Sequence, residues 1–168
     1  FLLKDYQKTR VEVFLNPDLD PKGKGYNVRQ AIIAVGSGEL FGKGLGNGLQ
    51  SQLKFLPERH TDFVFASASE EIGFVGAIVL LILYLILFQR LIFIMQRSRD
   101  DLGYYIAGGV LALIFAQVVI NIGMNIGLLP VTGIPLPFVT AGGSSIIVVF
   151  LCLGIAQNVI RQSKALRF

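Results

Sequence analysis

The sequence predicts an all-α membrane protein that crosses the bilayer several times. Of its 168 residues, 53% are hydrophobic and only 15% are charged, whereas soluble domains carry roughly 25% charged residues. The charges are also segregated, because residues 1–71 hold nine Lys/Arg and nine Asp/Glu while residues 102–160 hold none. The basic residues form no clustered stripe of the kind that binding to a phosphate backbone requires, so we expect no nucleic-acid partner.

Three apolar runs are long enough to cross a membrane, which takes about 20 helical residues. The first covers residues 72–95 and the second covers residues 102–124. The third covers residues 145–160 and follows a segment, 125–144, that prolines and glycines interrupt. Non-helical backbone at membrane depth persists only where protein or water covers it, so we expect this Pro/Gly loop to complete a cleft.

Basic residues near the short loops predict the orientation of the helices. Arginines lie in the connection 96–101, and arginine and lysine lie in the tail 161–168. The positive-inside rule makes both segments cytoplasmic. The polar region 1–71 and the Pro/Gly loop then share the external side, and we expect region 1–71 to form a large extracytoplasmic loop with short interfacial helices. Since the chain has no initiator Met, we expect it to be part of a longer protein.

The polar segment that precedes the first apolar run is where we expect the chemistry. An ionised side chain in a bilayer costs a few kcal/mol, so the charged residues there must pair, stay at the interface or line a wet cavity. Asp62 is the candidate general base, because a helix that began there would turn it toward the small residues Ala66 and Ser69. The alternative is that Asp62 or Thr61 is an N-cap, which contributes about 1 kcal/mol.

Other polar residues have structural interpretations that compete with functional ones. Glu70 and Glu71 point about 100° apart on a helix, so at least one is expected to pair with a residue elsewhere. His60 stands without the Cys and carboxylate companions of a zinc site, which favours a hydrogen-bonding or interfacial role. Gln117, Asn121 and Asn125 recur every four residues, a pattern typical of hydrogen bonds between membrane helices.

The glycine-rich sequence GKGLGNG at residues 42–48 has two interpretations. Its glycines would let backbone amides approach an anion, and Lys43 would add charge. However, it has neither the Walker spacing nor the dinucleotide fingerprint. The competing interpretation is a flexible turn between interfacial helices.

Three segments carry a more specific pattern: GSGELFGKGLGNG, then LPERHTDFVFA with EEIGFVG, then NIGMNIGLLPVTGIPLPF with GGSS. In this order, across residues 29–157, they resemble the SEDS family (shape, elongation, division and sporulation), most closely its RodA branch. The resemblance implies a fold of ten transmembrane helices, of which this chain would hold the large external loop after the seventh helix and the last three helices. Thr140-Ala141 differs from the Ser-Tyr common in the family, and residues 67–69 replace a more apolar stretch; both bear on local substrate contacts.

The resemblance implies a peptidoglycan glycosyltransferase that polymerises lipid II into glycan strands during cell elongation. Asp62 would deprotonate a hydroxyl of the acceptor sugar, which would attack the donor glycan with inversion and release undecaprenyl pyrophosphate. The enzyme would lie in the bacterial inner membrane with its active site on the extracytoplasmic side, partnered by a class B penicillin-binding protein, a transpeptidase. A lipid II flippase and a non-catalytic scaffold of a cell-wall synthase are the alternatives.

The departing pyrophosphate needs positive charge where its negative charge accumulates. A divalent cation, Mg²⁺ or Mn²⁺, held with help from acids is the alternative to basic side chains, and the sequence assigns no metal ligand. The candidate substrate-binding residues are Lys43, Lys54, Arg59, Arg29, Glu58 and His60. Supporting or structural roles are expected for Glu70, Glu71, Asn121, Pro135, Gly142, Gly143 and Ser144.

Overall fold

The computed structural model describes residues 10, 12–16, 20, 23–48 and 61–164. All regular secondary structure in these residues is helical, which confirms the predicted all-α class. The labelled helices are α2 (Lys24–Ser37), α4 (Val64–Gln96), α5 (Asp101–Asn125) and α6 (Gly143–Lys164). Helices α4, α5 and α6 are each long and apolar enough to cross a membrane, and each contains one of the three predicted apolar runs.

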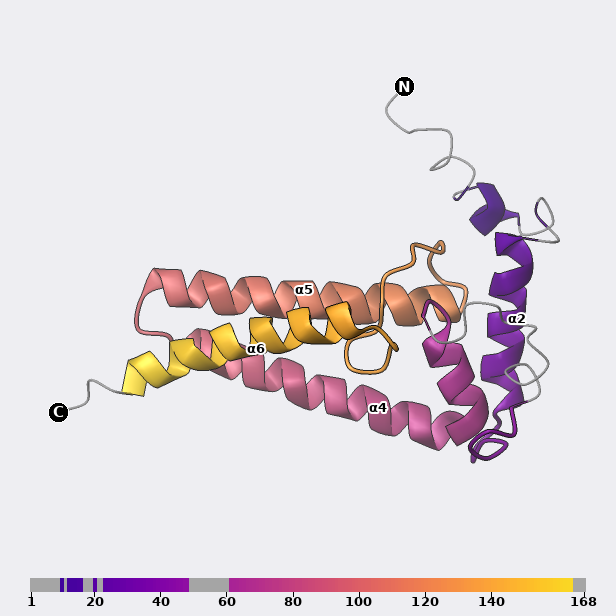
Figure 1. The fold of residues 1–168 in the computed structure, drawn as a ribbon, viewed down its shortest axis with the longest axis horizontal. Helices are drawn as coiled ribbons and strands as arrows, with labels where there is room; N and C mark the ends of the chain where they lie inside the picture. Colours follow the sequence, from indigo (N-terminus) through magenta and orange to yellow (C-terminus); the bar gives the residue numbers. More distant parts are fainter. Residues whose placement is uncertain (1–9, 11, 17–19, 21–22, 49–60, 165–168) are drawn as a thin grey trace, which may run out of the picture.

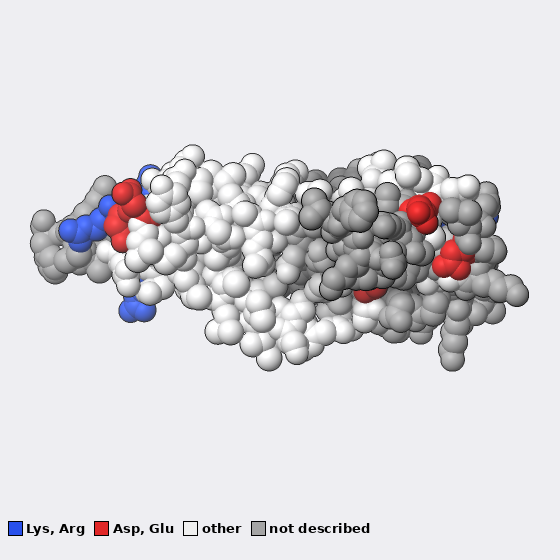
Figure 2. Space-filling model, turned by 90° about the horizontal axis from the view of Figure 1, so that it is seen from above, with Lys and Arg blue, Asp and Glu red and all other residues white. Residues whose placement is uncertain are grey.

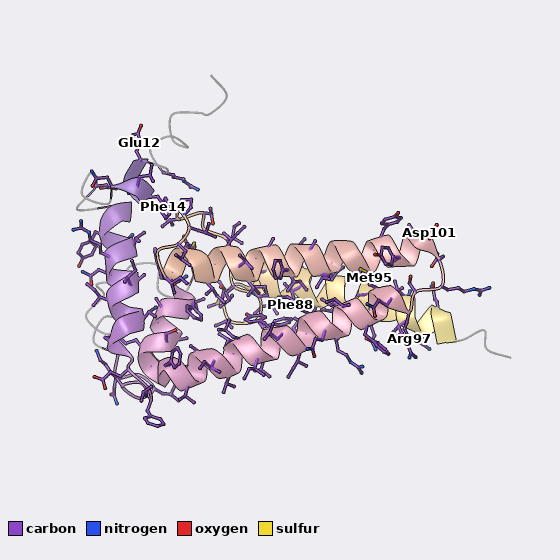
Figure 3. The ribbon with its side chains drawn as sticks, turned by 180° about the vertical axis from the view of Figure 1, so that it is seen from behind. Glu12, Phe14, Phe88, Met95, Arg97 and Asp101 are labelled. Carbon is purple, nitrogen blue, oxygen red and sulfur yellow. The ribbon has the colours of Figure 1, made fainter. Side chains whose placement is uncertain are left out.

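Helices α4 and α5 form a long antiparallel hairpin, and α6 lies alongside it (Figure 1). Helix α2 crosses one end of this bundle at a steep angle, and the Pro/Gly loop between α5 and α6 lies at that same end. The turn between α4 and α5, marked by Arg97 and Asp101 in Figure 3, lies at the other end together with the end of α6. The turn between α4 and α5 and the last turn of α6 therefore share one end of the bundle, and α2 and the Pro/Gly loop share the other.

The surface of the bundle is that of a protein immersed in lipid. In Figure 2 the charged side chains that the structure describes lie toward the two ends of the long axis, and the described surface between them is uncharged. Large apolar side chains face outward along the helices, for example Leu83 (58% exposed) and Phe150 (59% exposed). Such exposure is unfavourable in water but not beside lipid tails, which are as apolar as leucine.

The inner faces of the three long helices pack against one another. Phe88 of α4 points into the space between α4 and α5 (Figure 3), where its ring meets Phe115 edge-on at 5.4 Å and stacks with Tyr84 at 6.3 Å. Leu91 and Ile114 are fully enclosed in the same cluster. Because lipid offers no hydrophobic driving force between helices, close van der Waals packing of this kind holds the bundle together.

Helix α4 is interrupted at Gly73, whose backbone angles (φ 71°, ψ −173°) are not helical. The short segment before Gly73 turns away from the long segment and lies beside α2 (Figure 1). The small side chains of Ala31 and Ala34 on α2 allow a close contact, in which they cluster with Phe63 and Ala66. The interruption therefore brings the turn at residues 61–63 to the end of the bundle where α2 lies.

Candidate active site

The backbone groups exposed by the interruption of α4 are paired with a loop that precedes it by about thirty residues in the sequence. This loop, residues 38–44, is called the docking loop here. An interrupted helix leaves N–H and C=O groups without their usual partners, and in a membrane each such group must be satisfied by protein. Four backbone hydrogen bonds between α4 and the docking loop satisfy these groups. Two are donated by α4, from Phe74 N to Glu39 O (2.9 Å) and from Val75 N to Leu40 O (3.1 Å). Two are donated by the loop, from Lys43 N to Glu70 O (3.0 Å) and from Gly44 N to Glu71 O (3.1 Å).

Two glycines make this close approach possible. A Cβ atom on Gly73 would lie 2.2 Å from the nitrogen of Gly42, and a Cβ on Gly42 would lie 2.2 Å from the oxygen of Glu71. Both glycines also have φ in the left-handed region, at 71° and 78°, which side chains disfavour. The amides of Lys43 and Gly44 are occupied by helix carbonyls, so the phosphate-cradle interpretation of these two amides is wrong.

A buried acid lies directly beneath the docking loop. Glu70 is completely buried, and its Oε1 lies 3.5 Å from Nζ of Lys43, whose side chain is 31% exposed. Glu70 thus has a partner elsewhere, as expected for one of the two adjacent glutamates. The position of Lys43 favours a structural role for this cation over pyrophosphate binding. Glu71 is half-buried, and Arg29 is exposed on α2.

Asp62 lies in a turn just before α4, and the structure corrects two expectations about it. The helix begins at Val64 with Phe63 as its N-cap residue and without a capping side-chain hydrogen bond from that residue, so Asp62 and Thr61 are not N-caps. The helical start at Asp62, on which its expected orientation toward Ala66 and Ser69 depended, is also absent, because residues 61–63 form a turn.

The carboxylate of Asp62 instead lies close to the Pro/Gly loop. A Cβ atom on Gly133 would be 3.4 Å from Oδ2 of Asp62. Gly133 has φ of 74°, a left-handed conformation that suits glycine and that lets the loop bend between Pro130 and Pro135. The Pro/Gly loop therefore lies against the turn that holds Asp62.

Buried polar side chains hold the backbone on which Asp62 stands. Asn121 and Asn125 of α5 are both completely buried, and Thr140 is 5% exposed. Two members of the predicted polar stripe on α5, Asn121 and Asn125, form hydrogen bonds to other segments, whereas the buried Oε1 of Gln117 has no partner among the described residues. The targets of these bonds were not predicted, nor was the role of Thr140. The bonds are Asn121 Nδ2 to Asp62 O (3.3 Å) and Ile134 O (2.8 Å), Asn125 Nδ2 to Asp62 O (3.1 Å), and Thr140 Oγ1 to Thr61 O (3.4 Å).

The remaining predicted residues are spread around this junction or lie outside the described part of the chain. Pro135 is half-buried near Ile134, Gly142 donates its N–H to Thr140 O at 2.9 Å, and α6 begins at Gly143 with Ser144 exposed in its first turn. Lys54, Glu58, Arg59 and His60 lie outside the described residues. Within the described residues no three His, Cys, Asp or Glu side chains gather as a metal site.

Two apolar hollows lie next to each other beside the first half of α4. One, of about 600 Å³, lies among α2, α4 and α5, and the buried Ser69 is in its lining. The other, of about 580 Å³, lies between α4 and α5 beside Tyr84 and Phe88. Leu81, Ile122 and Ile126 line both, so the two hollows are neighbours, and together they are called the groove beside α4.

The helices, the uncharged middle band and the acid at one end define a multi-pass membrane protein with a polar site at the end of its bundle. A family model described as a cell cycle protein, FtsW/RodA/SpoVE, matches residues 1–165. The chain belongs to this family, which confirms the resemblance to SEDS proteins.

Curated relatives show the same similarity across almost the whole chain. It is 49% identical to peptidoglycan glycosyltransferase MrdB of Escherichia coli over 99% of its length and 45% of that relative. It is 46% identical to stage V sporulation protein E of Bacillus subtilis, over 95% of this chain and 43% of that protein. It is 42% identical to peptidoglycan glycosyltransferase RodA of Treponema pallidum, over 94% of this chain and 36% of that protein. The chain thus spans less than half the length of these relatives.

Solved structures agree with these similarities. A chain from a study of how a peptidoglycan synthase complex coordinates polymerisation and crosslinking matches 97% of this chain and 44% of itself, with a TM-score of 0.76 and 33% identity. A variant of the rod shape determining protein RodA from Thermus thermophilus matches 93% of this chain and 54% of itself, with a TM-score of 0.60 and 29% identity.

Proposed function

We propose that this chain forms the C-terminal part of a peptidoglycan glycosyltransferase that polymerises lipid II during cell elongation, with Asp62 as its general base. Asp62 removes the proton from a hydroxyl of the acceptor sugar as that oxygen attacks the donor glycan with inversion. The donor's polyprenyl pyrophosphate leaves. The observation that carries the proposal is the position of Asp62, anchored through its backbone by buried amides and facing Gly133 at the end of a membrane bundle.

The surroundings of Asp62 suit an amphiphilic substrate. Polyprenyl-linked sugars need an apolar surface for the lipid and a polar site for the sugars, and the groove beside α4 lies within the same bundle as the Asp62 junction. A base at the end of the helices meets sugars that cannot enter the hydrocarbon. The names of the curated relatives, peptidoglycan glycosyltransferases at up to 49% identity, support the same chemistry.

The orientation and the partner are further parts of the proposal. The basic turn between α4 and α5 faces the cytoplasm under the positive-inside rule, so Asp62 faces the extracytoplasmic side of the bacterial inner membrane. The partner is a class B penicillin-binding protein that crosslinks the new strands. Support comes from the structural neighbour, which belongs to a study of how a peptidoglycan synthase complex coordinates polymerization and crosslinking.

In this proposal, positively charged side chains stabilise the departing pyrophosphate. Arg29, Lys54 and Arg59 are the basic side chains proposed for this role, with Glu58 and His60 as further contacts to substrate. A divalent cation, Mg²⁺ or Mn²⁺, is the alternative source of charge. Chelation of divalent ions in a lipid II polymerisation assay distinguishes the two, because charge supplied by arginine and lysine survives chelation.

The test of the proposed base is Asp62→Asn in the complete protein, assayed with purified lipid II and the partner transpeptidase. General-base catalysis contributes about 10²–10⁴-fold, so the rate of glycan polymerisation is expected to fall at least about 100-fold. The melting temperature is expected to stay close to that of the wild type, because the hydrogen bonds to this residue from α5 are made to its backbone oxygen.

The matched control is Glu12→Gln, which neutralises an acid that is exposed and points away from the bundle (Figure 3). This variant is expected to polymerise lipid II at the wild-type rate. Normal polymerisation by a well-folded Asp62→Asn variant would remove Asp62 from the mechanism. Failure of the wild type itself to polymerise lipid II beside an active partner would argue instead for a flippase.

A further inference from the structure

The first turn of α4 is capped by a side chain from another helix. Helix starts leave backbone N–H groups without partners, and a Ser, Thr, Asp or Asn at the N-cap usually satisfies one of them. Phe63 cannot do so, and no side chain caps the helix from that position. Instead Oδ1 of Asn125, on α5, accepts a hydrogen bond from Ala66 N at 3.0 Å. Asn125 thus supplies the cap that the local sequence lacks.

The nitrogen of the same amide contacts the backbone of Asp62, the residue proposed as the base. Nδ2 of Asn125 lies 3.1 Å from Asp62 O and 2.8 Å from Asn121 O. An amide nitrogen donates two hydrogen bonds and the amide oxygen accepts, so these contacts use both of its ends. Rotating the amide by 180° would place its oxygen against two carbonyl oxygens. Its orientation is therefore determined by its partners, and complete burial excludes water as a substitute.

Asn121 links α5 to both the turn that holds Asp62 and the Pro/Gly loop. Its Nδ2 reaches Asp62 O at 3.3 Å and Ile134 O at 2.8 Å. Ile134 follows Gly133, the residue that faces the Asp62 carboxylate. One turn of α5 therefore holds both the backbone of Asp62 and the loop that faces it, so their separation depends on these two asparagines.

We propose that Asn125 is a positioning residue for glycosyl transfer, which it promotes by fixing the peptide of Asp62 against α5. The inference rests on the proposed function, since it gives Asp62 the role of base. Asn125 acts through Asp62, and its contacts are with the protein backbone and Asn121. Geometry matters because a misplacement of about 1 Å in a reacting group can cost about 100-fold in rate.

The test compares Asn125→Leu with wild type in the complete protein and its partner, measuring the initial polymerisation rate against lipid II concentration. The expected result is a fall in kcat of about 10- to 100-fold. KM is expected to change less than about twofold, because the substitution leaves the groove beside α4 and the basic side chains proposed to bind pyrophosphate unchanged. The matched control is Gln117→Leu, which removes an amide from the same stripe of α5; Gln117 Oε1 has no hydrogen-bond partner among the described residues. This control is expected to retain the wild-type kcat.

A second measurement separates positioning from general loss of structure. In an Asp62→Asn background, Asn125→Leu is expected to change the residual rate less than about twofold, because residues that act as a unit are non-additive. If Asn125→Leu melts below the assay temperature, Asn125→Ser, which leaves a small polar side chain in the site, is assayed in its place.

The outcomes distinguish this inference from the proposed function. An inactive Asp62→Asn variant together with a wild-type kcat in a folded Asn125 variant would overturn positioning alone. An equal loss of rate in both backgrounds, or a change confined to KM, would also overturn it. Full activity of Asp62→Asn would overturn the proposed base, and positioning with it.

Discussion

Helix α4 is irregular at two places, and the two are stabilised in different ways. At Gly73 the interrupted backbone pairs with the backbone of the docking loop through four crossed hydrogen bonds. At the start of the helix the unpaired groups are satisfied by side chains, chiefly the amides of Asn121 and Asn125. The first arrangement depends on two glycines, Gly42 and Gly73, which let the two backbones approach closely. The second depends on the hydrogen-bonding groups of particular side chains.

This difference predicts which substitutions each place tolerates. Backbone pairing at the docking loop accepts a change of most side chains but not a Cβ at the points of closest approach. At the helix start the loss of a donor or acceptor is expected to lower stability, because a buried polar group without a partner costs about 1–3 kcal/mol. Sterically demanding changes therefore test the first place, and isosteric polar-to-apolar changes test the second.

The largest effect is expected from Gly73→Ala. The new Cβ would lie 2.2 Å from Gly42 N, and alanine would have to adopt φ of 71°. Backbone strain of about 1–3 kcal/mol adds to a similar cost of overpacking, so the protein should fail to accumulate or should melt far below wild type. Thermal denaturation in detergent measures this. Gly109→Ala, in a helical position with open space around it, should melt at or above the wild-type temperature; equal melting of both variants would contradict the steric argument.

An intermediate effect is expected from Lys43→Met, which removes a cation 3.5 Å from the buried Glu70. Removing one partner of a buried pair costs several kcal/mol; since Lys43 is partly exposed, we expect about 1–3 kcal/mol of lost stability. In the double variant Lys43→Met/Glu70→Gln part of the loss should return, because the buried charge is gone. Thermal melting of the two single variants and the double variant gives the coupling, and a Lys43→Met variant as stable as wild type would show that the pair contributes nothing.

The smallest effect is expected from Thr140→Val, which keeps the shape of the side chain but removes its hydroxyl. That hydroxyl accepts a hydrogen bond from Leu136 N at 2.7 Å and lies 3.4 Å from Thr61 O. Its loss should lower the stability by about 1–2 kcal/mol. Thr132→Val is the control, since Thr132 is exposed and its hydroxyl lies 3.9 Å from the sulfur of Met124, too far for a strong hydrogen bond. If the melting temperatures of both variants fell equally, the hydroxyl of Thr140 would contribute no more to stability than that of Thr132.

Apolar run length was sufficient to predict the three long helices. Each run exceeds or approaches the length that spans a bilayer, and helix is the local structure that satisfies its own backbone there. The interruption at Gly73 was not predictable in the same way, because EEIGFVG reads as a continuation of the helix. Its cause is a loop about thirty residues earlier, and a contact at that distance leaves no periodic signal in the sequence.

The site was predictable in its residue types but not in its connections. Asp62 stood out as an acid beside an apolar run, and Asn121 and Asn125 stood out by their four-residue spacing. The sequence could not indicate that both amides reach the backbone of Asp62 or that Gly133 faces its carboxylate, since these contacts join residues far apart in the chain. The assignment of Asp62 as base stays a prediction, as do the roles of Lys54, Glu58, Arg59 and His60.

The cap on α4 has a consequence for the order of events during biosynthesis. Ala66 and the asparagine that caps it are 59 residues apart in the sequence, and this asparagine is the last residue of α5. The ribosome must therefore make all of α5 before the first turn of α4 has its partner. The long segment after Gly73 forms its own backbone hydrogen bonds and needs no such delay. Translocation machinery would therefore receive a nascent α4 whose apolar part is ready to insert while its polar beginning waits for the next helix.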